Sequence, residues 1–362
     1  MMDFDRRLGR LNARRQDASI DPSMLLVESY AKRTMSKAVK YTLGSMQEVD
    51  PRSTQISHEE AEKVERNLSE GLKKVGLEPD FRLQGSVAAN THIRGVSDVD
   101  LLCIEGVFLT IEKCEPTKKH YSDYQGRGTL VDDVLHLRSE AIKVLNTKFW
   151  GANVETHHDK SIALSGGAFR RKVDVVPSHW HDTVKYQQSL DETFRAVEIV
   201  NKSTREKIRN FPFLYISQLN QADAQTNGGT KMAIRLAKNL KNDSSYDIKL
   251  SSYDIGSVFY HCPNQQLSYL PTQDLKVLAG AEAWLSWLEE NPIQAKELDT
   301  PDHTRKIIDT NEKWTGLKLL AQELRDLTDE VADDLGYTQA SSYPHVTELR
   351  KSLTEARIPM VH

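Results

Sequence analysis

Three aspartates in this sequence have the spacing and the neighbours of metal ligands. Asp98 and Asp100 are two positions apart at the start of an apolar run, 101–104, that predicts a central strand. Because side chains alternate along a strand, residues at i and i+2 point to the same face. Asp174 lies among valines in a second expected strand and would complete the cluster. Carboxylates this close repel each other unless cations lie between them, and their oxygens suit Mg²⁺.

Such a cluster predicts phosphoryl-transfer chemistry. Two divalent ions, Mg²⁺ or Mn²⁺, typically lie ~4 Å apart and stabilise the attacking and leaving oxygens of an in-line displacement. Gly85 and Ser86 precede the aspartates. The glycine lets the backbone approach a phosphate closely, and the serine supplies an amide and a hydroxyl to bind it. A lone aspartate pair or a lone Gly-Ser often occurs without function. Their order and the third aspartate favour a metal-dependent site for phosphoryl transfer.

A second set of candidate residues lies in the C-terminal half. Lys231, Arg235 and Lys238 follow helical spacing opposite an apolar face. They predict either a solvated basic face, which is the commoner case, or a cationic wall that neutralises a triphosphate. Ser252 and Tyr253 follow, offering a hydroxyl for a phosphate and a ring for stacking on a base. For Tyr253, ordinary packing is the alternative.

The pattern of apolar residues predicts an α+β fold, in which a mixed sheet with flanking helices lies beside a C-terminal helical lobe. We expect a nucleotidyltransferase core with N-terminal helices at 1–200 and a helical lobe that closes the nucleotide cleft at 201–362. The expected helices are 22–40, 57–76 (opening with a Ser57/Glu60 capping box), 130–149, 230–242, 274–289 and 313–335. The expected strands are 81–84, leading into a Gly-Ser turn, then 97–104, 161–165 and 171–176, the last closed by Pro177.

Two segments keep alternative interpretations. Arg170, Arg171 and Lys172 either serve an activating ligand or form a solvated strand edge, and we favour the edge. The stretch 341–362 is either a loose tail or a partner-binding segment.

Composition excludes several classes of protein. With 48 basic and 52 acidic residues the net charge is −4, which argues against a surface built for nucleic acid. The three cysteines show neither a disulfide framework nor zinc-site spacing. Because the chain has no signal-like N-terminus and no apolar run of membrane-spanning length, we expect a soluble, cytoplasmic protein that does not enter a membrane.

Taken together, the motifs resemble those of the DNA polymerase beta-like nucleotidyltransferase superfamily. The resemblance rests on the segments 84–86 (Gln-Gly-Ser), 97–101 (Ser-Asp-Val-Asp-Leu) and 173–177 (Val-Asp-Val-Val-Pro). The helix around 235–238 and the Ser-Tyr pair at 252–253 are similar to the cyclic GMP-AMP synthase/dinucleotide cyclase-like (CD-NTase) branch of bacterial anti-phage signalling. The resemblance extends from about residue 55 to residue 260. The sequence lacks the zinc insertion of the animal enzyme, so a bacterial-type member is expected.

The resemblance implies a role for each motif. Asp98 and Asp100 would bind both metals, and Asp174 would complete the site of the metal that activates the attacking hydroxyl. The expected nucleotide-binding residues, with Tyr253 stacking on the donor base, are Gln84, Gly85, Ser86, Lys231, Arg235, Lys238, Ser252 and Tyr253.

Enzymes of this branch turn nucleoside triphosphates into cyclic or short linear oligonucleotides that switch on a separate effector protein. Whether a regulatory protein also binds the enzyme is left open by the resemblance. One alternative is a template-independent RNA-end nucleotidyltransferase of the poly(A)- or CCA-adding kind, which the balanced charge disfavours. A decayed, non-enzymatic binding module is a second alternative, which the intact motifs disfavour.

Overall fold

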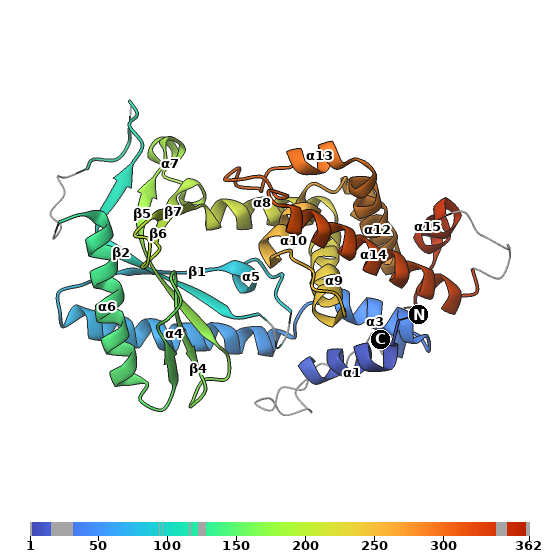
Figure 1. Ribbon diagram of the computed structural model, residues 1–362, viewed down its shortest axis with the longest axis horizontal. Helices are drawn as coiled ribbons and strands as arrows, with labels where there is room; N and C mark the ends of the chain where they lie inside the picture. The colour runs from blue at the N-terminus through green and yellow to red at the C-terminus, as the bar shows by residue number, and fades with distance from the viewer. Residues whose placement is uncertain are drawn as a thin grey trace. The chain divides into compact units, whose positions relative to one another are not determined.

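The computed structural model describes residues 2–15, 32–93, 95, 97–115, 117–121, 128–337 and 346–359 (Figure 1). The chain forms two compact units. One comprises 51–89 and 97–217, and the other comprises 1–50, 90–96 and 218–362. This division differs from the predicted domains, because the first 50 residues belong to the helical unit and the later boundary lies near 217 rather than 200.

The first unit contains the sheet. Its elements are α4 (Pro51–Lys73), β1 (Asp80–Gln84), α5 (Gly85–Ala88), β2 (Val99–Ile111), α6 (Leu130–Lys148), β3 (Asn153–Glu155), β4 (Ile162–Ser165), β5 (Val173–Asp182), α7 (Val184–Ser189), β6 (Ala196–Val200) and β7 (Lys207–Asn210). The seven-stranded sheet has the order β1-β2-β5-β4-β3, and β6 and β7 extend it from the second half of β5. Strands β2 and β5 are parallel and the other pairs are antiparallel, so the predicted mixed sheet is observed.

Alternation along the strands divides their side chains between the two faces of the sheet, and each face carries an apolar cluster. Side chains of β2 and β5 at every second position, among them Leu101 and Val175, pack in one core with the stripes of α4 and α6. The residues between them, including Asp100 and Asp174, therefore point to the opposite face.

Four details of the sheet unit differ from the predictions. Helix α4 begins at Pro51, so Ser57 and Glu60 are buried inside it and form no capping box. Residues 85–88 form the short helix α5 instead of a simple turn. Strand β5 continues through Pro177 to Asp182. It pairs with β4 before the proline and with β6 after it, and a residue without an N–H is tolerated between the two pairings. The chain beyond 200 is also not wholly helical, since β7 lies there.

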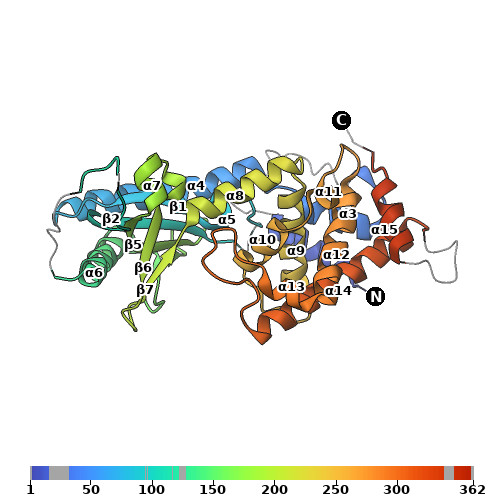
Figure 2. The same cartoon turned by 90° about the horizontal axis from the view of Figure 1, so that it is seen from above.

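The second unit is helical. Its elements, together with α8 at the boundary, are α1 (Phe4–Arg15), α3 (Lys37–Met46), α8 (Pro212–Gln225), α9 (Gly229–Asp243), α10 (Ser252–Tyr260), α11 (Asn264–Leu267), α12 (Asp274–Glu290), α13 (Pro292–Glu297), α14 (Asn311–Asp334) and α15 (Val346–Glu355). Helix α12 packs against α14 and α15 (Figure 2). The helices predicted at 230–242, 274–289 and 313–335 are confirmed as α9, α12 and α14 within two residues at each end.

Two terminal predictions fall partly outside the described residues. Of the helix predicted at 22–40, residues 16–31 are not described, and 34–36 are not helical because Ser36 caps α3 and accepts a hydrogen bond from the amide of Val39. In the C-terminal stretch, residues 338–345 and 360–362 are not described. The described part forms α15, whose Leu349 and Leu353 are buried, so it is not a loose tail. In the described part of the chain, no helix is long and apolar enough to cross a membrane.

Candidate active site

The predicted carboxylates lie on one face of the sheet, in a row across neighbouring strands. Gln84 on β1 is aligned with Asp100 on β2, and Asp100 is aligned with Asp174 on β5. Aligned residues on neighbouring strands project to the same face and lie close together. Asp98, which directly precedes β2, lies beside Asp174, because both carboxylates contact the same ammonium group.

That ammonium belongs to Lys172. Its Nζ lies 2.8 Å from Asp98 Oδ2 and 3.3 Å from Asp174 Oδ1. Burial lowers the pKa of Lys172, but the two carboxylates outweigh burial and leave the pKa above its ordinary value. The interpretation of Lys172 as a solvated strand edge is therefore wrong.

The two arginines that precede Lys172 also have polar partners. Arg170 forms ion pairs with Glu59 and Glu60 on α4, and Arg171 donates a hydrogen bond to Ser53 Oγ. These arginines therefore connect the start of β5 to α4, and Arg170 remains exposed, so the prediction of a solvated edge stays open for it.

Asp174 has the surroundings of a carboxylate that needs a cation. Burial raises its pKa, Lys172 opposes this increase, and the charge of Asp98 adds to it. Its Oδ1 is buried and accepts no hydrogen bond from the described residues. An oxygen of this kind, beside two further carboxylates, fits a divalent ion, and Asp98, Asp100 and Asp174 are the residues that would hold it.

Gly85 is required by the position of Asp100. Its φ is +72°, in the left-handed region that side chains other than glycine avoid. A Cβ there would overlap Asp100 Oδ2 and lie 3.0 Å from Asp100 Cγ. Ser86 follows in α5 and is half-buried. The Gly-Ser pair thus packs its backbone directly against the carboxylate row.

The cations on α9 belong to the helical unit and are buried. Lys231 Nζ donates to Asn220 Oδ1 (2.7 Å), and Lys238 Nζ donates to the carbonyl of Thr91 (2.7 Å). Arg235 donates to the carbonyls of Met46 and Asn90, at 2.8 and 2.9 Å. Burial lowers the pKa of Lys231 and of Arg235. The interpretation of this set as a solvated basic face is therefore wrong.

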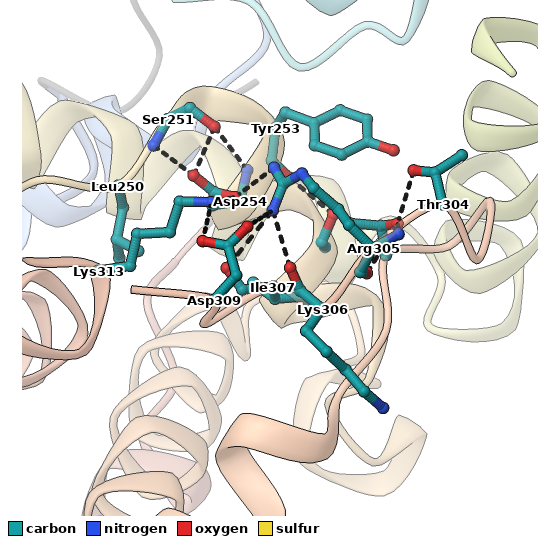
Figure 3. Close-up of polar contacts among 12 residues, drawn as sticks. Leu250, Ser251, Tyr253, Asp254, Thr304, Arg305, Lys306, Ile307, Asp309 and Lys313 are labelled. Atoms are coloured by element: carbon teal, nitrogen blue, oxygen red, sulfur yellow. Dashed lines mark hydrogen bonds and ion pairs between the residues drawn. The ribbon is translucent and has the colours of Figure 1, made fainter. Parts of the chain in front are cut away.

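Ser252 and Tyr253 open α10, which Ser251 and Asp254 cap reciprocally (Figure 3). Ser252 is exposed, whereas Tyr253 is half-buried. Burial and the Asp302 carboxylate raise the pKa of Tyr253.

Arg305, which the sequence did not single out, holds this region together. Its guanidinium lies 5.3 Å from the Tyr253 ring centroid and donates to Asp254 Oδ1 at 2.6 Å. Lys313 adds a second cation, 3.3 Å from the same Asp254 oxygen (Figure 3). The Tyr253 ring thus lies beside a charged network of Arg305, Asp254 and Lys313.

Comparisons with known proteins agree with this fold. A family model described as the cGAS/DncV-like nucleotidyltransferase C-terminal helical domain matches residues 217–330. The chain is 39% identical to the cyclic dinucleotide synthase CdnE of Yersinia aleksiciae over 314 residues, covering 86% of this chain and 81% of that protein. It is 30% identical to a c-di-GMP synthase of a Lachnospiraceae bacterium over 319 residues, covering 82% and 90% of the two chains.

A solved structure is also similar along most of the chain. The STING-associated CdnE c-di-GMP synthase from Capnocytophaga granulosa superposes with a TM-score of 0.75 at 26% identity, covering 93% of this chain and 100% of that chain. Fold and similarity thus define a nucleotidyltransferase of the polymerase beta-like class, as predicted. Within that class, the chain belongs to the cGAS/DncV-like (CD-NTase) family.

Proposed function

We propose that this enzyme joins nucleoside triphosphates into a cyclic dinucleotide, and that the row of Asp98, Asp100 and Asp174 is its catalytic centre. The observation that carries the proposal is the convergence of these carboxylates on the sheet face opposite α4 and α6, with Gly85 against Asp100 and Lys172 as the counter-ion. The names of the relatives support the product class, since the two relatives compared above are a cyclic dinucleotide synthase and a c-di-GMP synthase. They also favour this function over RNA-end nucleotide addition.

The proposed reaction is nucleotidyl transfer, carried out twice. A ribose hydroxyl of one nucleotide attacks the α-phosphorus of another, the bond between the α-phosphorus and pyrophosphate breaks, and the hydroxyl proton passes to water. Two divalent ions, when bound to the carboxylates, would increase the nucleophilicity of the hydroxyl and stabilise the leaving oxygen. Gly85 lets the backbone approach the triphosphate, and Ser86 contributes a hydroxyl and an amide. Gln84 lies next to Asp100 in the register and would contact the same nucleotide.

We further propose that the helical unit binds the nucleotide through α9 and α10. Ser252 would contact a phosphate, and Tyr253 would stack on the donor base with its ring held by Arg305. Lys231, Arg235 and Lys238 would bind the triphosphate in exchange for the side-chain and carbonyl oxygens that they now contact.

The product is proposed to act as a second messenger in the cytoplasm, by activating a separate effector protein in defence against phage. The similarity to a STING-associated c-di-GMP synthase supports an effector of that kind. A regulatory protein partner is part of the same proposal.

The site is tested by replacing carboxylates with amides of the same shape. Asp98→Asn and Asp174→Asn should abolish turnover of labelled triphosphates, while their circular dichroism spectra stay native. Glu62→Gln is the control, because Glu62 is an exposed acid on α4 in the same unit. Turnover at the wild-type rate in either aspartate variant would overturn the assignment.

A further inference from the structure

The carboxylate row extends beyond Asp174. Ala163 on β4 is aligned with Asp174, and Glu155 on β3 is aligned with Ala163. Glu155 therefore projects to the same sheet face as Asp174, which agrees with Val154 packing against the core on the other side. With neighbouring strands about 4.8 Å apart, Glu155 lies roughly 10 Å from the catalytic row.

Two histidines meet Glu155 at the end of β3. His158 Nε2 lies 3.4 Å and His157 Nε2 lies 4.0 Å from Glu155 Oε2. The ring centroids are 4.0 Å apart, and one ligand atom from each of the three residues lies within 4.8 Å of the others. The side chains are 32–70% exposed, so an ion from solvent can reach them.

The backbone that carries these rings is held by two cations. Arg138 on α6 donates to the carbonyls of Thr156, His158 and Ser161 at 2.8–3.1 Å. Lys202 donates to the carbonyls of Thr156 and His157, both at 2.7 Å. These bonds fix the turn on both sides of the histidine pair. An ion would therefore meet ligands that are already in place, which lowers the entropic cost of binding.

We propose that Glu155, His157 and His158 bind a transition-metal dication of the Zn²⁺ type, with water completing its coordination. Two imidazoles and one carboxylate are a donor set that Zn²⁺ and Co²⁺ prefer. Mg²⁺ prefers oxygen ligands alone, so the site differs in chemistry from the aspartate row. The three ligands lie within the four residues from Glu155 to His158, so a local signal for this cluster was present in the sequence and was not singled out.

The proposal is independent of the cyclic-dinucleotide product, but one consequence rests on the proposed function. An ion at this position adds two positive charges to the sheet face on which a polyanionic substrate would bind. Its occupancy would therefore change nucleotide affinity.

The test is a Co²⁺ titration followed by visible absorption, because nitrogen ligands in a four-coordinate site give intense bands that carboxylate-only sites lack. The full chain is used with Asp98→Asn and Asp174→Asn, which removes the aspartate row as a competing site. We expect saturable binding of one Co²⁺, reversed by Zn²⁺. Adding His157→Ala and His158→Ala should raise the apparent Kd at least about tenfold and remove the bands.

Adding His120→Ala instead is the control, because His120 is exposed and outside the cluster, and it should leave the titration unchanged. As a second readout, Zn²⁺ should raise the melting temperature of the chain that carries only Asp98→Asn and Asp174→Asn. It should not raise that of the variant that also carries His157→Ala and His158→Ala. Bands that persist in the double variant, or binding that never saturates, would overturn the proposal.

Discussion

Gly85→Ala tests whether the close approach of the backbone to Asp100 is what the active site needs. The substitution places an L side chain at φ +72°, which costs about 1–2 kcal/mol of folding free energy. It also pushes the new Cβ into Asp100 Oδ2, so the carboxylate must move. If Asp100 is a metal ligand, its displacement forfeits part of a charge stabilisation worth several kcal/mol. A loss of ~3 kcal/mol corresponds to a fall of more than 100-fold in kcat/KM.

Gly76→Ala is a matched control. Gly76 has φ +77°, and no heavy atom lies within 4 Å of the position that its Cβ would take. Both variants therefore carry the same backbone cost, and only Gly85→Ala disturbs Asp100. Chemical denaturation measures the free energy of unfolding, and initial rates of pyrophosphate release measure activity. Similar destabilisation with activity lost only in Gly85→Ala is the expected result. Near wild-type activity in Gly85→Ala would show that the active site does not need the close approach of residue 85 to Asp100.

Three further predictions concern the groups around the two candidate nucleotide-binding regions. Lys172→Met should lower the Mg²⁺ concentration for half-maximal activity, because the ammonium competes for the oxygens of Asp98 and Asp174; a higher midpoint in a Mg²⁺ titration would contradict this. Asp174→Asn should raise the melting temperature of the metal-free protein at neutral pH. Because the pKa of Asp174 is raised in the folded protein, wild type loses stability as the pH increases through that pKa. The difference in melting temperature between Asp174→Asn and wild type should therefore shrink in acid. A difference that does not change with pH would contradict this. Arg305→Ala and Arg305→Lys should both raise KM for the triphosphate, since neither keeps a planar group over Tyr253. Thermal melting should show the larger loss for alanine, because lysine keeps a positive charge for Asp254 and alanine does not. An unchanged KM in both variants would remove Arg305 from the site.

The parts of the site that follow from one strand could be predicted from the sequence. Because residues at i and i+2 on a strand share a face, the sequence predicts that Asp98 and Asp100 lie on the same side. The same spacing relates Lys172 to Asp174 and indicates that their side chains are neighbours, but Lys172 was interpreted as part of a strand edge. The alignment of Asp100 with Asp174 could not be predicted in this way, because the parallel register of β2 with β5 is set by packing between distant segments.

The helical unit shows where periodicity stops being informative. Three cations on one side of α9 have the pattern of a solvated face, yet all three are buried. Arg235 and Lys238 donate to backbone carbonyls at positions 46, 90 and 91, far away in sequence. Local rules also misplaced the start of α4. Ser57 and Glu60 match a capping box, but the helix extends six residues earlier to Pro51, where both side chains become part of a buried helix face.

The most direct test of the central claim is product formation by the purified chain. The protein is incubated with all four radiolabelled triphosphates and Mg²⁺ or Mn²⁺, and the products are treated with phosphatase and resolved by chromatography and mass spectrometry. We expect a phosphatase-resistant cyclic dinucleotide that disappears with chelator and in Asp174→Asn. A product that is only linear and phosphatase-sensitive, or a cyclic product that persists in Asp174→Asn, would contradict the central claim.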